Sequence, residues 1–326
     1  MTSAPAATGR PGAFSRAAIR LESLLVLAVL VIAMAILSPY FLSVSNFLNI
    51  LLATSVIGVL AVGATFVISS AGIDLSVGSV LAFAGVVGAL VAGPFGLGWP
   101  LGLIACILAG AFAGFINGFL ITRGGIPPFI VTLGMLGVAR GAGLVFTNGL
   151  AIYGLPPEFV YLGQGRPLGI PSPVIILAIT VIVAHIVLAH TRFGLYSQVI
   201  GDNEVAARAM GIRVDRHKVM LYTLSGALAG LAGLLFAARV NAGDPTAGIN
   251  YELTAITAAI IGGTNLFGGR GTVIGTVIGA LIMGVLQNGL NLLAVPSFYQ
   301  QMAIGAVLVL AVWFDGLNRN RGARRK

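Results

Sequence analysis

Long, uninterrupted apolar runs, many of about 20 residues, constrain this chain more than any other sequence feature. A run of that length can cross the hydrocarbon core of a bilayer as a helix. Only 8% of the residues are charged and 58% are hydrophobic, whereas soluble domains carry about 25% charged residues. A soluble protein of this composition would have no surface to present to water. Continuous runs also differ from the short alternating segments of a transmembrane β-barrel. We therefore expect an all-α polytopic membrane protein.

The runs predict about ten transmembrane helices, two of them associated with breaks in the chain. The third segment follows directly on residues 72–78, and the eighth is short and runs into the glycine-rich residues 262–269. Both places are typical of tight turns or half-helices rather than ordinary loops. The ten predicted segments are residues 22–38, 47–70, 77–93, 99–121, 127–147, 173–190, 218–238, 252–263, 272–293 and 297–314.

The positions of Lys and Arg predict the orientation of these helices. With the N-terminus in the cytoplasm, fifteen of the eighteen basic residues fall on the cytoplasmic side, as the positive-inside rule predicts. Topology and contact with lipid headgroups therefore explain the formal charge of +9 without a nucleic-acid partner. The expected organisation is a cytoplasmic N-terminal tail (1–20), a transmembrane domain (21–316) with a charged cytoplasmic loop (191–217), and a basic cytoplasmic C-terminal tail (317–326).

Short sequence matches suggest an internal repeat. Residues 116–119 in the fourth segment (Ile-Asn-Gly-Phe) resemble residues 287–290 in the ninth (Gln-Asn-Gly-Leu). These two segments run in opposite directions, so the match predicts an inverted repeat of segments 2–5 on segments 7–10. A second register, which aligns residues 72–75 with residues 263–266, would give a parallel repeat instead. We favour the inverted one.

The loop at residues 191–217 contains the signals of a short capped helix. Either Asp202 or Asn203 can start the helix by accepting a free backbone N–H. Gly211 can end it in a left-handed turn. The sequence therefore predicts a short helix between these residues on the cytoplasmic face.

The two faces of this predicted helix differ. Glu204 and Arg208 are spaced to form an i, i+4 ion pair. The other face carries a narrow apolar stripe of Val205, Ala206, Ala209 and Met210. Small side chains let a groove of another protein approach the helix backbone closely. We interpret the helix as a docking site for a cytoplasmic motor protein; the alternative is a solvated connector helix.

The residues of this helix also carry a family resemblance. Residues 201–212, Gly-Asp-Asn-Glu-Val-Ala-Ala-Arg-Ala-Met-Gly-Ile, resemble the coupling loop of ABC importer permeases, in the form found in ribose/xylose/arabinose-type sugar permeases. Residues 71–79, 146–149, 245–248, 287–293 and 299–300 are similar to further motifs of that family, with Phe146 where the family has Tyr. The resemblance covers nearly all of residues 20–316. It implies that the following residues form the ATPase-coupling helix: Gly201, Asp202, Asn203, Glu204, Ala206, Ala207, Arg208, Met210 and Gly211.

The resemblance implies a function and a set of partners. It implies a type II-like importer permease bundle in the bacterial inner membrane, with both termini cytoplasmic, that translocates a monosaccharide such as ribose. ATP and Mg would be bound by a separate cytoplasmic ABC ATPase subunit, so this chain would be a transport subunit rather than an enzyme and would need no cofactor. Neither Lys218 nor Lys326 lies in a P-loop, in agreement with that division. A periplasmic sugar-binding protein and a second permease copy, identical or homologous, are the other implied partners.

Polar residues inside the apolar segments are candidates for the translocation pathway, because such residues are costly in a membrane. Asp74 has two interpretations: a gate or break residue that caps the next helix, or an N-cap exposed at the inner surface. Asparagines in the helices could bind sugar hydroxyls or could join helices to one another. Arg140 could line the pathway or extend toward the membrane surface, and we favour the second. The pathway candidates are Asp74, Ser76, Asn117, Asn288 and Asn291.

Two other functions remain open. A permease of the same fold could carry branched-chain amino acids or nucleosides, but an amino acid favours charged partners, which are scarce here. An ion-coupled secondary transporter would work alone and would not need a docking helix.

Overall fold

The computed structural model describes residues 13–323, with side-chain environments for residues 21–313. Its architecture is helical, and six helices are long and apolar enough to cross a membrane, with four shorter apolar helices beside them. Each of the ten predicted segments corresponds to one of these helices. They are α1 (Ala13–Leu37), α2 (Val44–Ser69), α3 (Val77–Ala92), α4 (Trp99–Arg123), α5 (Pro128–Thr147), α7 (Ser172–His190), α10 (Val214–Val240), α11 (Tyr251–Ile261), α12 (Val273–Leu292) and α13 (Ser297–Ala323).

The outermost helices extend further than the hydropathy pattern predicted. Helix α1 begins within the expected N-terminal tail, and α13 continues to Ala323 through much of the expected C-terminal tail. The remaining parts of both expected tails, residues 1–12 and 324–326, lie outside the described residues.

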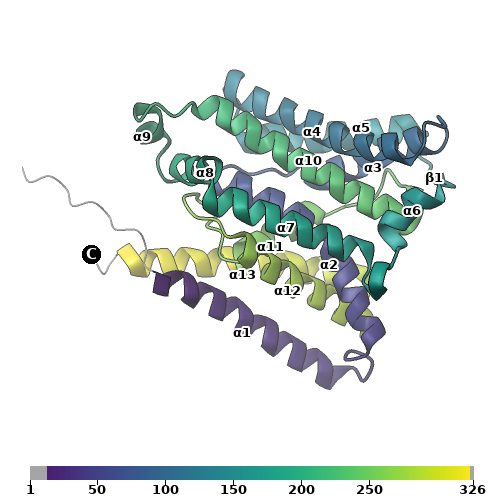
Figure 1. Ribbon diagram of the computed structural model, residues 1–326. Coiled ribbons are helices and arrows are strands. Elements are labelled where there is room, and N and C mark those ends of the chain that lie inside the picture. Colours follow the sequence, from purple (N-terminus) through teal and green to yellow (C-terminus); the bar gives the residue numbers. More distant parts are fainter. Residues whose placement is uncertain (1–12, 324–326) are drawn as a thin grey trace, which may run out of the picture.

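Short elements lie at the two ends of the helix bundle. Helices α8 (Arg192–Asp202) and α9 (Glu204–Ala209) lie at one end, called here the α9 end, together with the end of α13 (Figure 1). Helix α6 (Pro157–Gln164) and strand β1 (Ile152–Tyr153) lie at the opposite end. There β1 pairs antiparallel with β2 (Ala242–Gly243), with Ile152 opposite Gly243. A 3₁₀ turn, η1, spans Pro167–Gly169.

Local sequence signals explain where several helices begin and end. The Ser43 and Thr272 side chains accept the N–H groups of Asn46 and Gly275, which caps α2 and α12. Proline occupies the first turn of α4, α5, α6 and α7, where its missing N–H costs nothing. Helices α5 and α10 end at Asn148 and Asn241 in left-handed conformations.

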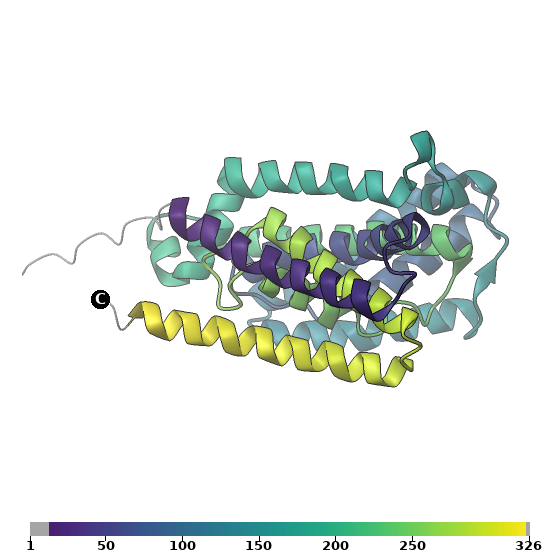
Figure 2. The same cartoon turned by 90° about the horizontal axis from the view of Figure 1, so that it is seen from below.

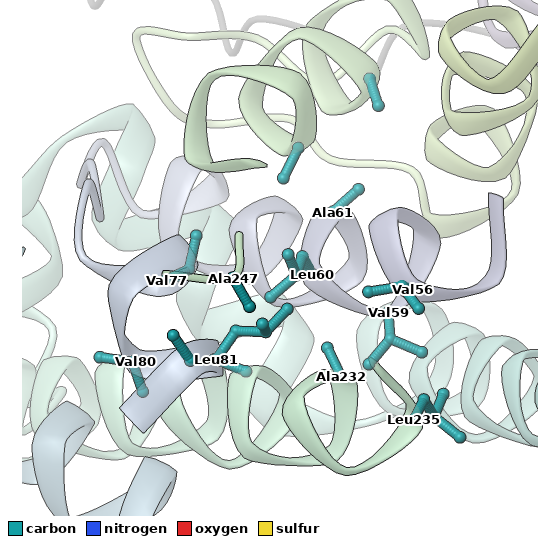
Figure 3. Close-up of a cluster of buried hydrophobic side chains, with 14 of the residues drawn as sticks. Val56, Val59, Leu60, Ala61, Val77, Val80, Leu81, Ala232, Leu235 and Ala247 are labelled. Carbon is teal, nitrogen blue, oxygen red and sulfur yellow. The ribbon is translucent and has the colours of Figure 1, made fainter. Parts of the chain in front are cut away.

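Helix α10 lies at the centre of the bundle and contacts α2, α3 and α4. Figure 2 shows α7 and α13 along opposite sides of the molecule, with α1 between them in that view. The central cluster of buried apolar side chains comes mainly from α2, α3 and α10, and Ala247 from the segment before α11 joins it (Figure 3). The interior is therefore built around two helices, α2 and α10, that run in opposite directions (Figure 1).

The helix contacts support the inverted repeat. Helix α10 packs against α3 and α4, and α2 packs in the same way against α11 and α12. In the two units α2–α5 and α10–α13, the short helix contacts the two helices that follow it: α3 contacts α4 and α5, and α11 contacts α12 and α13. This pattern is what two units of opposite direction, α2–α5 and α10–α13, produce when each packs on the other.

Glycines bring α4 and α10 into backbone contact. A Cβ built on Gly226 would lie 2.2 Å from the carbonyl oxygen of Gly110, and a Cβ on Gly230 would lie 2.3 Å from that of Cys106. Small residues allow this close approach where water does not drive helix association. The abundance of glycine in the apolar runs is thus a packing feature.

Replacing Gly226 with alanine is expected to separate α4 from α10 and to lower the free energy of unfolding by about 1–3 kcal/mol, as in other overpacked cores. Gly137→Ala is the matched control, because nothing lies within 4 Å of a Cβ at that position. The thermal midpoint of each variant in detergent measures the effect. Equal midpoints for the two variants would contradict the packing argument.

Candidate functional site

The predicted coupling segment, residues 191–217, forms α8, α9 and the start of α10. Asn203 caps α9, because its side-chain oxygen accepts the N–H of Ala206 at 2.9 Å. Gly211 follows α9 in a left-handed conformation with φ of +80°. Of the two predicted capping residues, Asn203 performs the role, and Asp202 is the last residue of α8.

Ion pairs join α9 to α10. Arg208 contacts Glu204 at 2.9 Å, which confirms the predicted i, i+4 pair. Glu204 also accepts a hydrogen bond of 2.6 Å from Lys218, and Arg208 pairs with Asp215. Lys218 and Asp215 were not predicted as partners; the signal that could have indicated them is the high density of charged residues at 204–218.

Partial burial raises the pKa of Glu204, but hydrogen bonds from Lys218 and Arg208 outweigh it and leave the pKa below its ordinary value. A carboxyl group with a lowered folded-state pKa stabilises the fold above its unfolded pKa of about 4.3, and this contribution disappears as the pH falls through the folded value. Hydrogen exchange of the α9 amides, corrected for the intrinsic rate, should therefore be constant from about pH 6 to 8 and accelerate below about pH 4. Glu204→Gln should reduce the protection at neutral pH and flatten the dependence. An unchanged profile in that variant would contradict the role of Glu204.

The two sides of α9 have different environments. Ala207 is fully buried beneath the helix, against Ile200 and Val214. Val205 and Met210 are 79% and 65% exposed. The exposed face also includes Ala206 and Ala209, so all four residues of the predicted apolar stripe face away from the chain. Ala207 is the coupling-helix candidate that faces inward, and its small size lets α9 lie close to α10.

Gly201 brings three separate parts of the chain together. A Cβ on this residue would lie 2.1 Å from the carbonyl oxygen of Ser69 and 2.6 Å from the amide nitrogen of Gly269. Gly269 donates a hydrogen bond of 3.1 Å to the same Ser69 oxygen. The end of α2, the end of α8 and the glycine-rich loop between α11 and α12 thus meet through their backbones. We call this meeting point the Gly201 junction.

The first break, residues 70–76, follows α2 directly from the Gly201 junction. Here Asp74 is 3% exposed. Its Oδ1 accepts the backbone N–H of Ser76 at 3.0 Å and the Ser76 hydroxyl at 2.6 Å, and its Oδ2 accepts the Ser225 hydroxyl at 3.0 Å. Asn117 donates to the Ser76 hydroxyl oxygen at 2.9 Å. The four residues form one buried cluster, called here the Asp74 cluster.

This cluster settles how Asp74 is placed. Asp74 is not an N-cap exposed at a surface. Its carboxylate organises a break inside the bundle, and the cluster is held by residues of α4 and α10. Ser225 was not predicted, because a single serine in an apolar helix gives no signal of a partner 151 residues away. The Asn117 side-chain oxygen has no hydrogen-bond partner among the described residues.

The other two pathway candidates lie elsewhere. Asn288 donates a hydrogen bond of 2.8 Å to Asn46. Asn291 is exposed and accepts a hydrogen bond of 2.8 Å from Gln300. Both lie on the last turns of α12, away from the Asp74 cluster. The structure therefore brings together Asp74, Ser76 and Asn117 but not the two asparagines of α12.

A second break, residues 241–250, separates α10 from α11. It contains an Asp-x-Thr turn like the Asp-x-Ser turn of the first break: Asp244 Oδ1 accepts the Thr246 N–H at 2.8 Å and the Thr246 hydroxyl at 2.7 Å. Pro245 and Ala247 are buried, so the segment enters the bundle. This break was not predicted, because its Asn, Gly, Asp and Pro residues are equally typical of a surface turn.

Arg140 on α5 binds the second break instead of extending toward the membrane surface. Its Nη1 donates hydrogen bonds of 2.7 and 2.6 Å to the carbonyl oxygens of Pro245 and Ala247. The interpretation of Arg140 as a snorkelling side chain is therefore wrong. Among the described residues, no group of three or more His, Cys, Asp or Glu could hold a metal ion.

Ten apolar helices, two broken segments and a projecting capped helix define a multi-pass membrane transport subunit. A family model described as "Branched-chain amino acid transport system / permease component" matches residues 46–312. The chain belongs to this family of permease components, as the motifs at residues 71–79 and 201–212 predicted.

Curated relatives with similar sequences are sugar permeases. The ribose import permease protein RbsC of Escherichia coli K12 is 45% identical over 298 residues, which are 90% of this chain and 92% of the relative. The ribose import permease protein RbsC of Bacillus subtilis 168 is 46% identical over 300 residues, 91% of this chain and 92% of the relative. The L-arabinose ABC transporter permease protein AraH of Azospirillum brasilense is 38% identical over 298 residues, 91% of this chain and 87% of the relative. No solved structure matches the chain.

Proposed function

We propose that this chain is the membrane-spanning permease subunit of an ATP-driven importer for a monosaccharide, with ribose as the first candidate. The observation that carries the proposal is the identity of 45–46% to two ribose import permeases, over about nine-tenths of each chain. The family description mentions branched-chain amino acids, but the relatives reported above are permeases for ribose and arabinose. A sugar is therefore preferred to an amino acid.

The proposed orientation places the α9 end in the cytoplasm and both termini on that side of a bacterial inner membrane. Arg208, Arg213, Arg216 and Lys218 lie at that end, as the positive-inside rule favours. A cytoplasmic ABC ATPase, which binds ATP and Mg, would dock there on α9. A periplasmic sugar-binding protein would bind at the opposite end, and a second permease copy would complete the pathway.

In the proposed mechanism the exposed face of α9 contacts the ATPase, and the rest of the segment passes its movement into the bundle. Ion pairs from Glu204 and Arg208 connect α9 to α10. The Gly201 junction connects α8 to the end of α2. Both routes reach the Asp74 cluster, since Ser225 lies on α10 and the first break continues α2. Closure of the ATPase would thus favour one of two conformations of the bundle, which differ in how the first and second breaks are arranged.

Reconstitution tests this function directly. The chain would be placed in liposomes with its ATPase subunit and its ribose-binding protein, and uptake of radiolabelled D-ribose measured with and without ATP. Uptake is expected only when all components and ATP are present. Uptake by the chain alone under an ion gradient would identify a secondary transporter instead, and ATP-driven uptake of leucine but not ribose would identify an amino acid permease.

A further inference from the structure

The second break lies within the membrane-spanning part of the bundle. Arg140 precedes the end of α5 by seven residues, a distance of about 10 Å along the helix. The Arg140 hydrogen bonds hold Pro245 and Ala247 at that depth. Further along, a Cβ on Gly78 in the first turn of α3 would lie 2.5 Å from the carbonyl oxygen of Gly248. The second break therefore reaches the point where α3 begins.

Non-helical backbone at such a depth is tolerated only where it is buried in protein or lines a water-filled cavity. The first break meets this condition by burial, since Asp74 and Ser76 are 3% and 1% exposed. The second break meets it only in part: Pro245 and Ala247 are buried, but Thr246 is exposed and Ile249 is 59% exposed. Polar backbone and a threonine hydroxyl at this depth are incompatible with surrounding lipid, so this face meets either a second protein chain or water.

The chemistry of this face suits a neutral polyhydroxylated ligand. Asp244 uses Oδ1 for the turn, and its Oδ2 has no hydrogen-bond partner among the described residues. Both Arg140 hydrogen bonds use Nη1, which leaves the Nη2 donors available. A carboxylate accepts and a guanidinium donates, whereas each sugar hydroxyl does both.

We propose that the second break forms a substrate-contact site on the aqueous pathway, in which Asp244, Thr246 and Arg140 bind hydroxyl groups of a monosaccharide. This site deepens the proposed function and depends on it. It also assigns the two breaks different tasks: the first holds the bundle together through the Asp74 cluster, and the second meets the substrate.

Accessibility of single cysteines tests whether this face meets water. Thr246→Cys and Ile249→Cys would be made in the chain, whose native Cys106 is fully buried, and the assembled transporter would be treated with a charged methanethiosulfonate reagent. Ile179→Cys is the matched control, because Ile179 is 57% exposed and lies on α7 seven residues from its first residue, at a comparable depth. We expect both test positions to react about tenfold faster than the control, because the thiolate is the nucleophile and apolar surroundings raise the pKa of a thiol. Equal rates would mean that lipid or the second permease copy covers the second break, and would overturn the proposal.

Conservative substitutions test contact with the sugar. Asp244→Asn keeps an oxygen for the turn but removes the charge, and Thr246→Val removes only the hydroxyl. Each is expected to lower the maximal rate of D-ribose uptake about tenfold, the effect of one lost hydrogen bond to a charged or buried group. Thr246→Ser should restore uptake. Normal uptake in both first variants would overturn the contact. The cysteine labelling needs no ribose, so a wrong substrate for the transporter and a wrong place for the site give different results.

Discussion

Gly201→Ala is expected to abolish ATP-driven uptake while leaving the chain inserted and bound to its ATPase subunit. The added methyl group would lie 2.1 Å from the Ser69 carbonyl oxygen, so α8 must move away from the end of α2. Backbone atoms cannot yield as a flexible side chain can, and packed interiors transmit such a shift instead of absorbing it. The variant should bind the ATPase normally, because the exposed face of α9 is unchanged. The measurement is uptake per ATP hydrolysed in the reconstituted transporter.

A glycine at which an added methyl group would contact nothing provides the control. Gly305→Ala places its methyl group where no atom lies within 4 Å, and its uptake should equal that of the unaltered chain. If Gly201→Ala transports normally, movement does not pass through the Gly201 junction. If Gly201→Ala instead releases the ATPase subunit, Gly201 acts in docking and the junction has no separate role.

Asp74→Ala is expected to prevent stable folding in the membrane. It removes the acceptor for the Ser76 N–H and the Ser225 hydroxyl. A buried group left without its partner costs about 1–3 kcal/mol, and here at least two groups are affected in the centre of the bundle. Folded protein after extraction in mild detergent, followed by size-exclusion chromatography, measures the loss.

Asp74→Asn separates the hydrogen bonds from the charge. Its amide oxygen still accepts the Ser76 N–H, and its amide nitrogen can donate to the Ser225 hydroxyl oxygen, so this variant should fold. Ser225→Ala should cost less than Asp74→Ala because Asp74 keeps its Ser76 contacts. Normal yield and thermal midpoint for Asp74→Ala would show that the Asp74 cluster does not hold the first break.

Much of the fold could be predicted from the sequence because hydropathy in a membrane is a strong, local signal. The ten apolar helices, the first break and the inverted repeat were all predicted. The second break could not be predicted, because Asn241 and Asp244 suggest the same turn whether it is at the surface or inside the bundle. The contacts of Arg140 with this segment reveal its depth, and they join residues 105 and 107 positions apart.

The candidate site was predictable to the extent that its signals were local. The cap at Asn203, the turn at Gly211 and the pair of Glu204 with Arg208 each depend on residues within one or two turns of each other. Which side of α9 faces outward depends on how α8 and α10 pack beneath it, so the inward position of Ala207 could not be read from the short helix alone. The Gly201 junction was hidden for the same reason, since both of its partners are distant in sequence.

Cross-linking from α9 tests whether the ATPase subunit docks on this helix. Val205→Cys would be labelled with a photoactivatable maleimide in the assembled transporter, and the irradiated product analysed for a covalent adduct with the ATPase subunit. Leu168→Cys, at the opposite end of the bundle and 99% exposed, is the control. We expect an ATPase adduct from residue 205 and none from residue 168. An adduct from residue 168 with none from residue 205 would contradict it.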